Sequence, residues 1–170
     1  IQIAEKSGKG YYPRWEFLNA YSGCMVGNPA VSVLTDAYQK GIQNYPVDKS
    51  IQYAINAVRT FGNNEDGYDP GDLSKTLEYA YSDWCVGTLL RSQNRVQEAD
   101  IYLKKSKAYR NVWCDSVKWF RARLSKEEWL PWKGKKVHWQ GCIESNNYQQ
   151  GWFVPQAVSY THLTLPTKRI

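Results

Sequence analysis

The sequence lacks the cysteine and histidine spacings that are typical of zinc-binding sites. Its four cysteines lie far apart, no CxxC pair occurs, and neither of its two histidines stands at zinc-finger spacing from a cysteine. Structural zinc sites need closely spaced ligands, so the sequence argues against a zinc ribbon. An even number of cysteines allows disulfides in an oxidising compartment, but the spacing does not pair them. The cysteines are Cys24, Cys85, Cys114 and Cys142.

Long apolar runs are missing as well. No run of apolar residues is long enough to cross a bilayer as a helix, so we expect no membrane-spanning segment. No signal peptide is visible, and the first residue is Ile1 rather than methionine. We therefore expect the sequence to be a fragment of a longer protein.

Positive charge is in excess, but it is not concentrated. The formal net charge is +6, and the lysines and arginines are scattered along the chain. The densest basic runs, within residues 104–107 and 133–136, are short. Nucleic-acid-binding proteins gather basic residues on one face or along one helix. The pattern favours a solvated surface, and no nucleic-acid partner is expected.

Aromatic residues, in contrast, are abundant. They make up 15% of the 170 residues and include eight tryptophans and thirteen tyrosines. Trp and Tyr are costly to bury completely, because each carries a polar group. Two interpretations stay open, a core rich in tryptophan and a surface that stacks on flat ligands.

Apolar residues recur at helical spacing along much of the chain, and no strand-like alternation is visible. Asn28 followed by Pro29 predicts the start of one helix, and Asp48 is placed to cap the next. Residues 110–142 are expected to be irregular and aromatic. Helices are predicted over residues 29–42, 49–61, 73–91 and 94–109, with a last one from Ser145 or Asn146 toward Phe153.

Loops of very unequal length join these helices, which predicts an all-α fold. A helical-repeat module and an α/α toroid both fit this pattern. In a toroid, long loops at one end of the helices build a carbohydrate site. No internal self-similarity appears at a period of about 34 residues, so the toroid is preferred.

The stretch GCIESNNYQQGWFVP, residues 141–155, places one carboxylate among amides and aromatics. A general acid that works at neutral pH needs a raised pKa, which partial burial against aromatic rings provides. Trp139, Tyr148 and Trp152 are the side chains expected to surround Glu144. The alternative is a glutamate near a helix start, favoured there by the helix dipole alone.

Several separated motifs, read in order, resemble one enzyme family. They are YYPRWEFLNAYSGCMVGNPAVSVLTDAYQKGI, LSKTLEYAYSDWCVGTLL, YRNVW and ESNNYQQGWFVP. In this order and spacing, over about residues 10–155, they resemble the catalytic domain of glycoside hydrolase family 92. The family's enzymes are exo-acting, calcium-dependent, inverting α-mannosidases, with an N-terminal β-sandwich followed by an (α/α)6 toroid. The resemblance implies that this chain is part of the middle of the toroid and lacks the β-sandwich.

Within this resemblance, Glu144 matches the family's general acid. The family motif Glu-Gly-Asn reads Glu144-Ser145-Asn146 here, and a serine in place of glycine calls the local backbone into question, because glycine tolerates a positive φ. Inverting glycosidases also need a second carboxyl group, roughly 6.5–9.5 Å from the first, to activate water. No residue of this chain matches that general base, so the fragment alone is expected to be inactive.

Arg14, in YPRW, matches a family arginine that reaches the sugar in the −1 subsite, where a guanidinium can bridge two hydroxyls. The alternative is a structural arginine paired with Glu16 or Asp36. The neighbouring Trp15 is either a stacking platform or a core residue, and the core is favoured. Asn146 is expected to contact the substrate.

Two acids lie five residues apart on the helix predicted over 73–91. Five residues turn an α-helix by about 500°, so Glu78 and Asp83 point about 140° apart and cannot line one pocket. Glu78 lies beside the apolar stripe and is expected in the substrate pocket, whereas Asp83 is expected to cap or pair structurally. Asp36 is expected to pair with Lys40, four residues further on.

The resemblance also implies a cofactor, substrates and a location. Ca2+ is expected near the −1 sugar, held mostly by residues outside this fragment. Asn146 and Gln149 carry oxygen donors of a suitable type, but neither is assigned as a ligand. The expected substrates are mannose-containing glycans such as N-glycans, with α-1,2 linkages, and their extracellular source implies a secreted or periplasmic protein.

Two parts are expected within the chain. Residues 1–156 form the partial catalytic domain, and residues 157–170 resemble translated sequencing-adapter sequence and are treated as a non-native tail. His162, in this tail, therefore receives no functional weight. A hypothesis of another class also stays open, a non-catalytic helical module that binds glycans or serves as a scaffold. Its aromatics would stack on sugar rings, and it would need neither a second carboxylate nor calcium.

Overall fold

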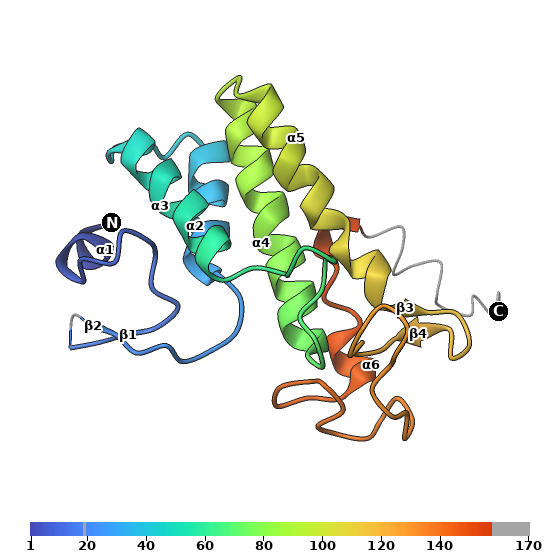
Figure 1. Cartoon of the computed structure of the whole chain (residues 1–170). Helices are drawn as coiled ribbons and strands as arrows, with labels where there is room; N and C mark the ends of the chain where they lie inside the picture. The colour runs from blue at the N-terminus through green and yellow to red at the C-terminus, as the bar shows by residue number, and fades with distance from the viewer. Residues whose placement is uncertain (19, 158–170) are drawn as a thin grey trace, which may run out of the picture. The chain divides into compact units, whose positions relative to one another are not determined.

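The computed structural model describes residues 1–18 and 20–157, and the predicted all-α class is confirmed, because the strands are only two residues long (Figure 1). The predicted tail lies outside the described residues except for Ala157. The α-helices are α1 (Gln2–Lys6), α2 (Pro29–Gln39), α3 (Val47–Thr60), α4 (Leu73–Ser92), α5 (Val96–Lys105) and α6 (Asn147–Gln150). The other elements are the 3-10 helices η1 (Ser106–Val112) and η2 (Pro155–Ala157) and the strands β1 (Glu16–Phe17), β2 (Ala20–Tyr21), β3 (Trp113–Cys114) and β4 (Trp119–Phe120).

The chain divides into two compact units. The first unit consists of Ile1–Gly62 and Glu78–Lys107, and the second consists of Asn63–Leu77 and the chain from Ala108 onward. Helix α4 contributes to both, because its first five residues belong to the second unit and the rest to the first.

Helices α2 and α3 begin near their predicted starts, but neither is capped as expected. The Asn28 side chain makes no cap hydrogen bond to α2, and its Nδ2 instead donates to the Phe61 carbonyl at 3.0 Å. Helix α3 begins at Val47, one residue before the predicted cap, with Pro46 at the N-cap. Asp48 therefore lies in the first turn, where the helix dipole favours a carboxylate.

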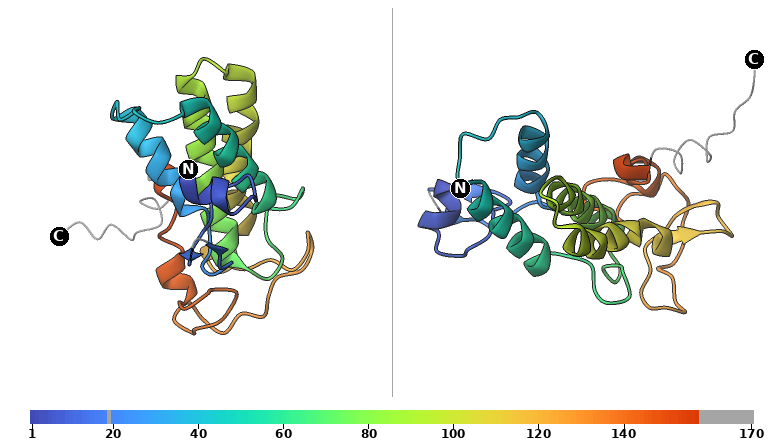
Figure 2. Two further views of the ribbon diagram at one scale, coloured as in Figure 1. Left: turned by 90° about the vertical axis from the view of Figure 1, so that its left-hand side faces the viewer. Right: turned by 90° about the horizontal axis from the view of Figure 1, so that it is seen from above.

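Helix α4 agrees with the predicted span, whereas the following helix differs from it. Asn94 adopts a left-handed backbone with φ of 58°, so α5 begins only at Val96. The predicted helix end near residue 109 falls inside η1, where the chain tightens from an α-helix into a 3-10 helix. In both views of Figure 2, α5 runs beside the part of α4 that belongs to the first unit.

The core of the first unit joins its helices and its N-terminal segment. Thr35 of α2 donates to the Cys85 carbonyl of α4 at 3.3 Å, and the Tyr12 hydroxyl donates to Ser50 of α3 at 2.7 Å. Burial of apolar side chains at helical spacing supplies the main driving force. Residues buried in this core include Val31, Ile51, Ala54, Ile55, Val86, Leu89, Leu90 and Ala99.

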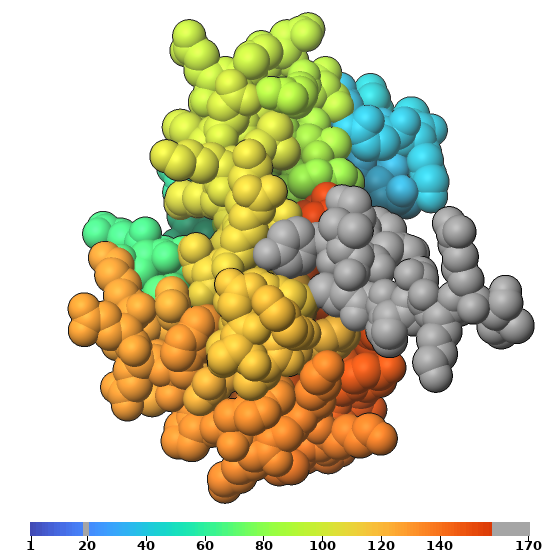
Figure 3. Space-filling view, turned by 90° about the vertical axis from the view of Figure 1, so that its right-hand side faces the viewer, coloured from blue at the N-terminus to red at the C-terminus, as the bar shows by residue number. Residues whose placement is uncertain are grey.

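The second unit holds the aromatic segment and carries the irregular loop that the sequence predicts. Strands β3 and β4 form a short antiparallel hairpin, with Trp113 opposite Phe120 and Cys114 opposite Trp119. Figure 3 shows the segment after β4 as a continuous orange surface. The core of the second unit includes Tyr68, Leu73, Leu77, Val112, Trp119, Phe120, Cys142 and Val154.

The aromatic residues divide into a buried set, which confirms a core rich in tryptophan, and an exposed set, for which stacking on flat ligands stays a prediction. Trp119 and Phe120 are 3% and 1% exposed and belong to the core, whereas Trp15 and Trp139 are 55% and 70% exposed. All four cysteines are described and are free thiols, of which Cys24 alone is exposed. None of the helices within residues 1–18 and 20–157 has the length and apolarity needed to cross a bilayer.

Candidate active site

Glu144 lies in a tight loop that precedes α6. The loop closes through an antiparallel bridge between His138 and Asn146, and the Trp139 amide donates to the Ser145 carbonyl at 3.3 Å. Glu144 adopts a left-handed backbone, with φ of 54°, and its side chain is exposed. Ser145 has no positive φ, so the strained position is the acid itself and not the serine that replaces the family's glycine.

The expected burial of Glu144 among aromatics is wrong for the described residues. Tyr148 stacks on Trp119 with ring centroids 5.6 Å apart, and Trp152 meets the same ring edge-on at 5.3 Å. Trp139 is itself 70% exposed. The aromatic rings therefore pack against the core tryptophan, or face solvent, and leave the carboxylate exposed. The helix-start alternative also fails, because α6 begins at Asn147 and has no acid in its first turn.

Hydrogen bonds fix the backbone on both sides of Glu144. The Ile143 amide donates to the Ser74 hydroxyl at 2.9 Å, and that hydroxyl donates to Gln150 Oε1, also at 2.9 Å. On the other side, the Ser145 hydroxyl donates to the same Gln150 oxygen at 3.4 Å. Sequence reasoning missed Ser74 and Gln150, although both lie in the motifs named above, because local spacing does not pair residues 76 positions apart.

Asn146 begins the helix that follows. Its Oδ1 accepts from the Gln149 amide at 2.9 Å, and its own amide donates to Gln149 Oε1 at 3.2 Å, which together form a capping box. The side chain is thus engaged in helix capping, and a substrate contact through Asn146 stays a prediction.

The same capping box bears on the expected Ca2+. The side-chain oxygens of Asn146 and Gln149 already accept backbone hydrogen bonds, so they are not available as ready ligands. Over residues 1–18 and 20–157, no group of three or more His, Cys, Asp or Glu side chains is arranged to hold a metal ion. The described residues do not fit a calcium site.

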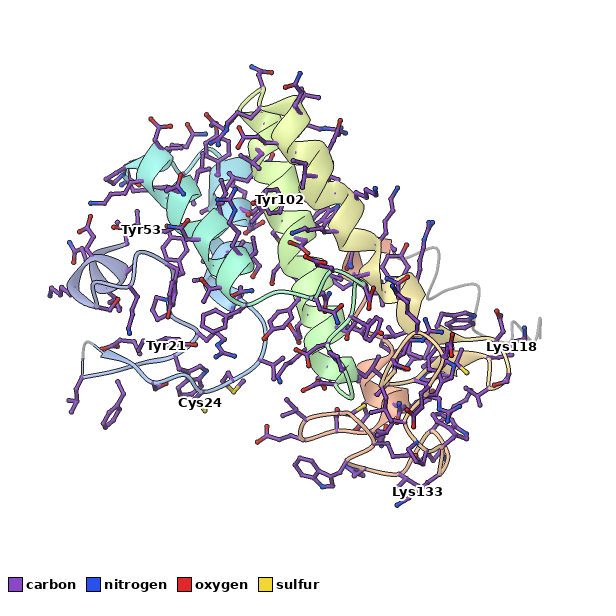
Figure 4. The ribbon with its side chains drawn as sticks, viewed as in Figure 1. Tyr21, Cys24, Tyr53, Tyr102, Lys118 and Lys133 are labelled. Carbon is purple, nitrogen blue, oxygen red and sulfur yellow. The ribbon has the colours of Figure 1, made fainter. Side chains whose placement is uncertain are left out.

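Arg14 lies in the first unit and organises the loop that contains it. Its Nε and Nη2 donate to the Tyr21 hydroxyl at 2.8 and 2.6 Å, and its Nη1 donates to the Met25 carbonyl at 2.9 Å. The guanidinium also lies over the Phe61 ring, with Cζ 4.3 Å from the centroid. Figure 4 labels Tyr21 and, further along the same loop, Cys24.

These contacts decide two of the alternatives for the Arg14 loop. Arg14 is held by a tyrosine and a backbone carbonyl, not by Glu16 or Asp36 as the structural alternative expected. Asp36 instead pairs with Lys40 at 2.7 Å, as predicted. Trp15 is 55% exposed, so the favoured core assignment is wrong. Trp15 directly precedes β1 of the short hairpin formed by β1 and β2.

Glu78 packs against the far end of the Arg14 loop. A Cβ placed on Gly27 would lie 2.7 Å from Glu78 Oε2, so the carboxyl group rests directly on the Gly27 backbone. Burial raises the pKa of Glu78 to about 7. Asp83 is 3% exposed, and burial raises its pKa to about 7 although Lys105 opposes this. Asp83 is therefore buried, and the expected cap or structural ion pair of Asp83 stays a prediction.

The predicted site residues thus fall into two groups. Arg14, Trp15 and Glu78 belong to the first unit, where the loop of residues 13–28 joins them, and Glu144 and Asn146 lie two positions apart in the second.

A family model supplies the decisive comparison. The model described as the glycosyl hydrolase family 92 catalytic domain matches residues 1–161. The chain belongs to glycoside hydrolase family 92. The match covers the loop of Arg14, helix α4 and the Glu144 segment together, so the resemblance seen in the separated motifs is confirmed. The predicted boundary between residues 156 and 157 stays a prediction.

Solved structures of the family are similar to this chain. The family GH92 α-mannosidase BT3965 from Bacteroides thetaiotaomicron is 25% identical, with a TM-score of 0.80 over 94% of this chain and 24% of that chain. The inverting mannosidase BT2199 from the same organism is 22% identical, with a TM-score of 0.77 over 96% of this chain and 26% of that one. The GH92 hydrolase ccman5 is 15% identical, with a TM-score of 0.71 over 96% of this chain and 23% of its own. A comparison with curated proteins found no match.

Two consequences follow for this GH92 chain. The expectation that it forms an all-α part of the family's toroid is confirmed. The chain spans about a quarter of the length of the structures that it matches.

Proposed function

We propose that this chain is a segment of an inverting exo-α-mannosidase in which Glu144 is the general acid. The observation that carries the proposal is the setting of Glu144 in a family 92 domain. The acid occupies the motif position, its side chain is exposed to solvent, and its backbone is held in a strained conformation. Strained residues that persist in a well-bonded loop are typical of functional sites. Two of the similar structures, an α-mannosidase and an inverting mannosidase, support the reaction class.

In this mechanism the Glu144 carboxyl group donates its proton to the glycosidic oxygen as the bond from that oxygen to the anomeric carbon breaks. A water molecule forms the new bond to the anomeric carbon from the opposite face and gives its proton to a second carboxylate. The configuration at the anomeric carbon is inverted. No residue of this chain is assigned as the second carboxylate, which we place outside the segment.

Arg14 is proposed to bind hydroxyls of the −1 sugar. Its bonds to Tyr21 and Met25 use only part of the donor capacity of a guanidinium, so N–H groups remain for a sugar. The same bonds hold the guanidinium in a defined orientation, which bidentate recognition requires. The exposed Trp15 beside it is proposed as a stacking surface for a sugar ring.

The finer properties rest on the family resemblance. We propose mannose-containing glycans as substrates, α-1,2-linked mannosides and N-glycans among them, and a secreted or periplasmic protein. Ca2+ dependence is also proposed, with the ligands outside the described residues. Hydroxyl oxygens of the sugar would coordinate the bound Ca2+.

The experiment that tests the general acid compares two leaving groups in the full-length protein. Glu144→Gln should lower kcat/KM about 10²- to 10⁴-fold on α-1,2-mannobiose, because the sugar leaving group must be protonated. The loss should be far smaller on 2,4-dinitrophenyl α-mannoside, whose leaving group departs without a proton. The matched control is Glu127→Gln, an exposed acid of the same unit, which should leave both substrates unaffected.

Near-normal hydrolysis of mannobiose by Glu144→Gln would remove Glu144 from the mechanism. If the unaltered full-length protein binds mannosides but hydrolyses neither substrate, the non-catalytic glycan-binding module is the better description. The exposed Trp15 and Trp139 are the observations that would then matter most.

A further inference from the structure

We propose that Ser74 and Gln150 are positioning residues for Glu144, acting together as a relay that holds the backbone on both sides of the acid. The inference rests on the proposed role of Glu144 as general acid. It assigns to two residues outside the ESN motif a part in setting where the proton is delivered.

The relay joins the start of α4 to the segment of residues 143–150, which is distant from it in sequence. Ser74 Oγ accepts from the Ile143 amide at 2.9 Å and donates to Gln150 Oε1 at 2.9 Å. Gln150 Oε1 also accepts from the Ser145 hydroxyl at 3.4 Å. The residue before Glu144 and the residue after it are therefore tied to the same pair of side chains.

The base of the relay is rigid. Ser74 is the second residue of α4, a helix of 20 residues, and is 2% exposed. The amides of Leu73 and Ser74, which lack acceptors within the helix, donate to the Gly141 carbonyl at 2.6 and 3.3 Å. The start of α4 thus anchors the loop at Gly141 through the backbone and at Ile143 through the serine hydroxyl.

The acid needs such support for two reasons. Its left-handed backbone, with φ of 54°, is a conformation that a non-glycine residue keeps only when its surroundings enforce it. Its side chain is exposed, so the packing that fixes a buried carboxyl group does not fix this one. The position of the carboxyl group therefore depends on the backbone, and the backbone depends on the relay.

Mispositioning a general acid has a kinetic signature that general loss of structure does not share. Proton delivery is sensitive to geometry, and a displacement of about 1 Å can cost about 10²-fold in rate. The cost falls only on substrates whose leaving group needs the proton. A relay variant should therefore resemble a weaker form of Glu144→Gln, with selective loss on poor leaving groups and an unchanged fold.

The test measures kcat/KM of the full-length protein on α-1,2-mannobiose and on 2,4-dinitrophenyl α-mannoside. Ser74→Ala and Gln150→Leu should each lose about 10- to 10²-fold on mannobiose and less than about 3-fold on the activated substrate. The control is Ser82→Ala, also on α4 and 3% exposed, whose hydroxyl donates to the Glu78 carbonyl at 2.9 Å. This control should show no difference between the two substrates.

The double variant and a direct structural readout complete the design. Because one hydrogen bond joins the two side chains while each also holds its own side of Glu144, Ser74→Ala with Gln150→Leu should lose more than either single variant but less than the two losses added as free energies. Amide hydrogen exchange on the 170-residue chain should become faster at Ile143 in Ser74→Ala and remain unchanged there in Ser82→Ala. If Ser74→Ala does not fold, Gln150→Leu carries the test, because Gln150 is only partly buried.

The two proposals fail in different ways. Equal losses on both substrates in Ser74→Ala and Gln150→Leu, or additive losses in the double variant, would overturn the relay while Glu144→Gln still shows selective loss. If Glu144→Gln shows no selectivity for the leaving group, the general-acid assignment fails first, and the relay fails with it.

Discussion

At the scale of single residues, Gly27 and Glu78 show how one contact shapes the Arg14 loop. Gly27 has φ of +74°, in the left-handed region, and the Glu78 side chain lies directly against it. A residue with a side chain would meet two obstacles there, the unfavourable backbone angle and a collision with the carboxyl group. Both ends of the Arg14 loop are thus held, by the Arg14 bonds to Tyr21 and Met25 and by this close approach.

Gly27→Ala should therefore destabilise the chain by more than the backbone angle alone explains. We expect a loss of about 1 kcal/mol from the positive φ, as for any such glycine, and a further loss from the collision. The matched control is Gly41→Ala, because Gly41 has φ of +77° and nothing within 4 Å of its Cβ position. Urea unfolding of both variants measures the difference.

Repeating the two glycine substitutions in a Glu78→Ala chain separates the cost of the collision from the cost of the backbone angle. In Glu78→Ala, which removes the carboxyl group, the extra cost of Gly27→Ala over Gly41→Ala should shrink. Equal costs for the two glycine variants in the unaltered chain would show that the loop does not depend on this contact.

At the scale of elements, helix α4 carries two acids whose environments both disfavour charge. Burial raises the pKa of Asp83 to about 7, with Lys105 of α5 opposing the effect, and burial alone raises the pKa of Glu78 to about 7. Tyr81, one turn beyond Glu78, has a pKa raised to about 12, mainly by burial. In the folded chain, these three side chains of α4 therefore keep their protons to a higher pH than they would in the unfolded chain.

The pH dependence of stability follows from the direction in which burial moves these pKa values. A raised carboxyl pKa means that the folded chain binds the proton more tightly than the unfolded chain. The free energy of unfolding should therefore be greatest near the ordinary carboxyl pKa of about 4, and should fall as the pH rises to about 7. A pKa that differs by one between the folded and unfolded chains corresponds to about 1.4 kcal/mol. The decline in the free energy of unfolding that Asp83 causes is therefore on the order of a few kcal/mol.

Asp83→Asn tests this account, because an amide of the same shape has no proton to lose. Denaturant unfolding from pH 4 to pH 8 should show a smaller decline in the variant than in the unaltered chain. Asp100→Asn serves as the control, since Asp100 is an exposed acid of α5 paired with Arg91 at 2.6 Å. A decline that is the same in all three chains would mean that Asp83 is charged throughout this range.

At the scale of the whole molecule, Glu144 is the one carboxyl group that we propose as catalytic, and the described residues hold no ready metal site. Inverting hydrolysis needs two carboxyl groups. We therefore expect the 170-residue chain alone to release no mannose from α-1,2-mannobiose, even with excess Ca2+. The full-length protein under the same conditions is the positive control. Turnover by the isolated chain would show that the general base lies within it.

The helices and the family could be predicted directly from the order of residues. Apolar spacing placed α2, α3 and α4 within three residues of their observed ends, because a helix buries a stripe that repeats every three or four positions. The Asp36–Lys40 pair was predicted for the same local reason. The motifs around Arg14, Glu78 and Glu144 were enough to predict the family that the comparison confirms.

Contacts between distant residues decided the rest. Trp15 is exposed, Arg14 binds Tyr21 and Met25, and the aromatics near Glu144 pack on Trp119, none of which follows from local spacing. The bond from Ile143 to Ser74 spans 69 positions, and the bond from Ser74 to Gln150 spans 76. Helical periodicity depends only on near neighbours and is therefore written in the sequence, whereas the support of the acid depends on which distant segments the folded core brings together.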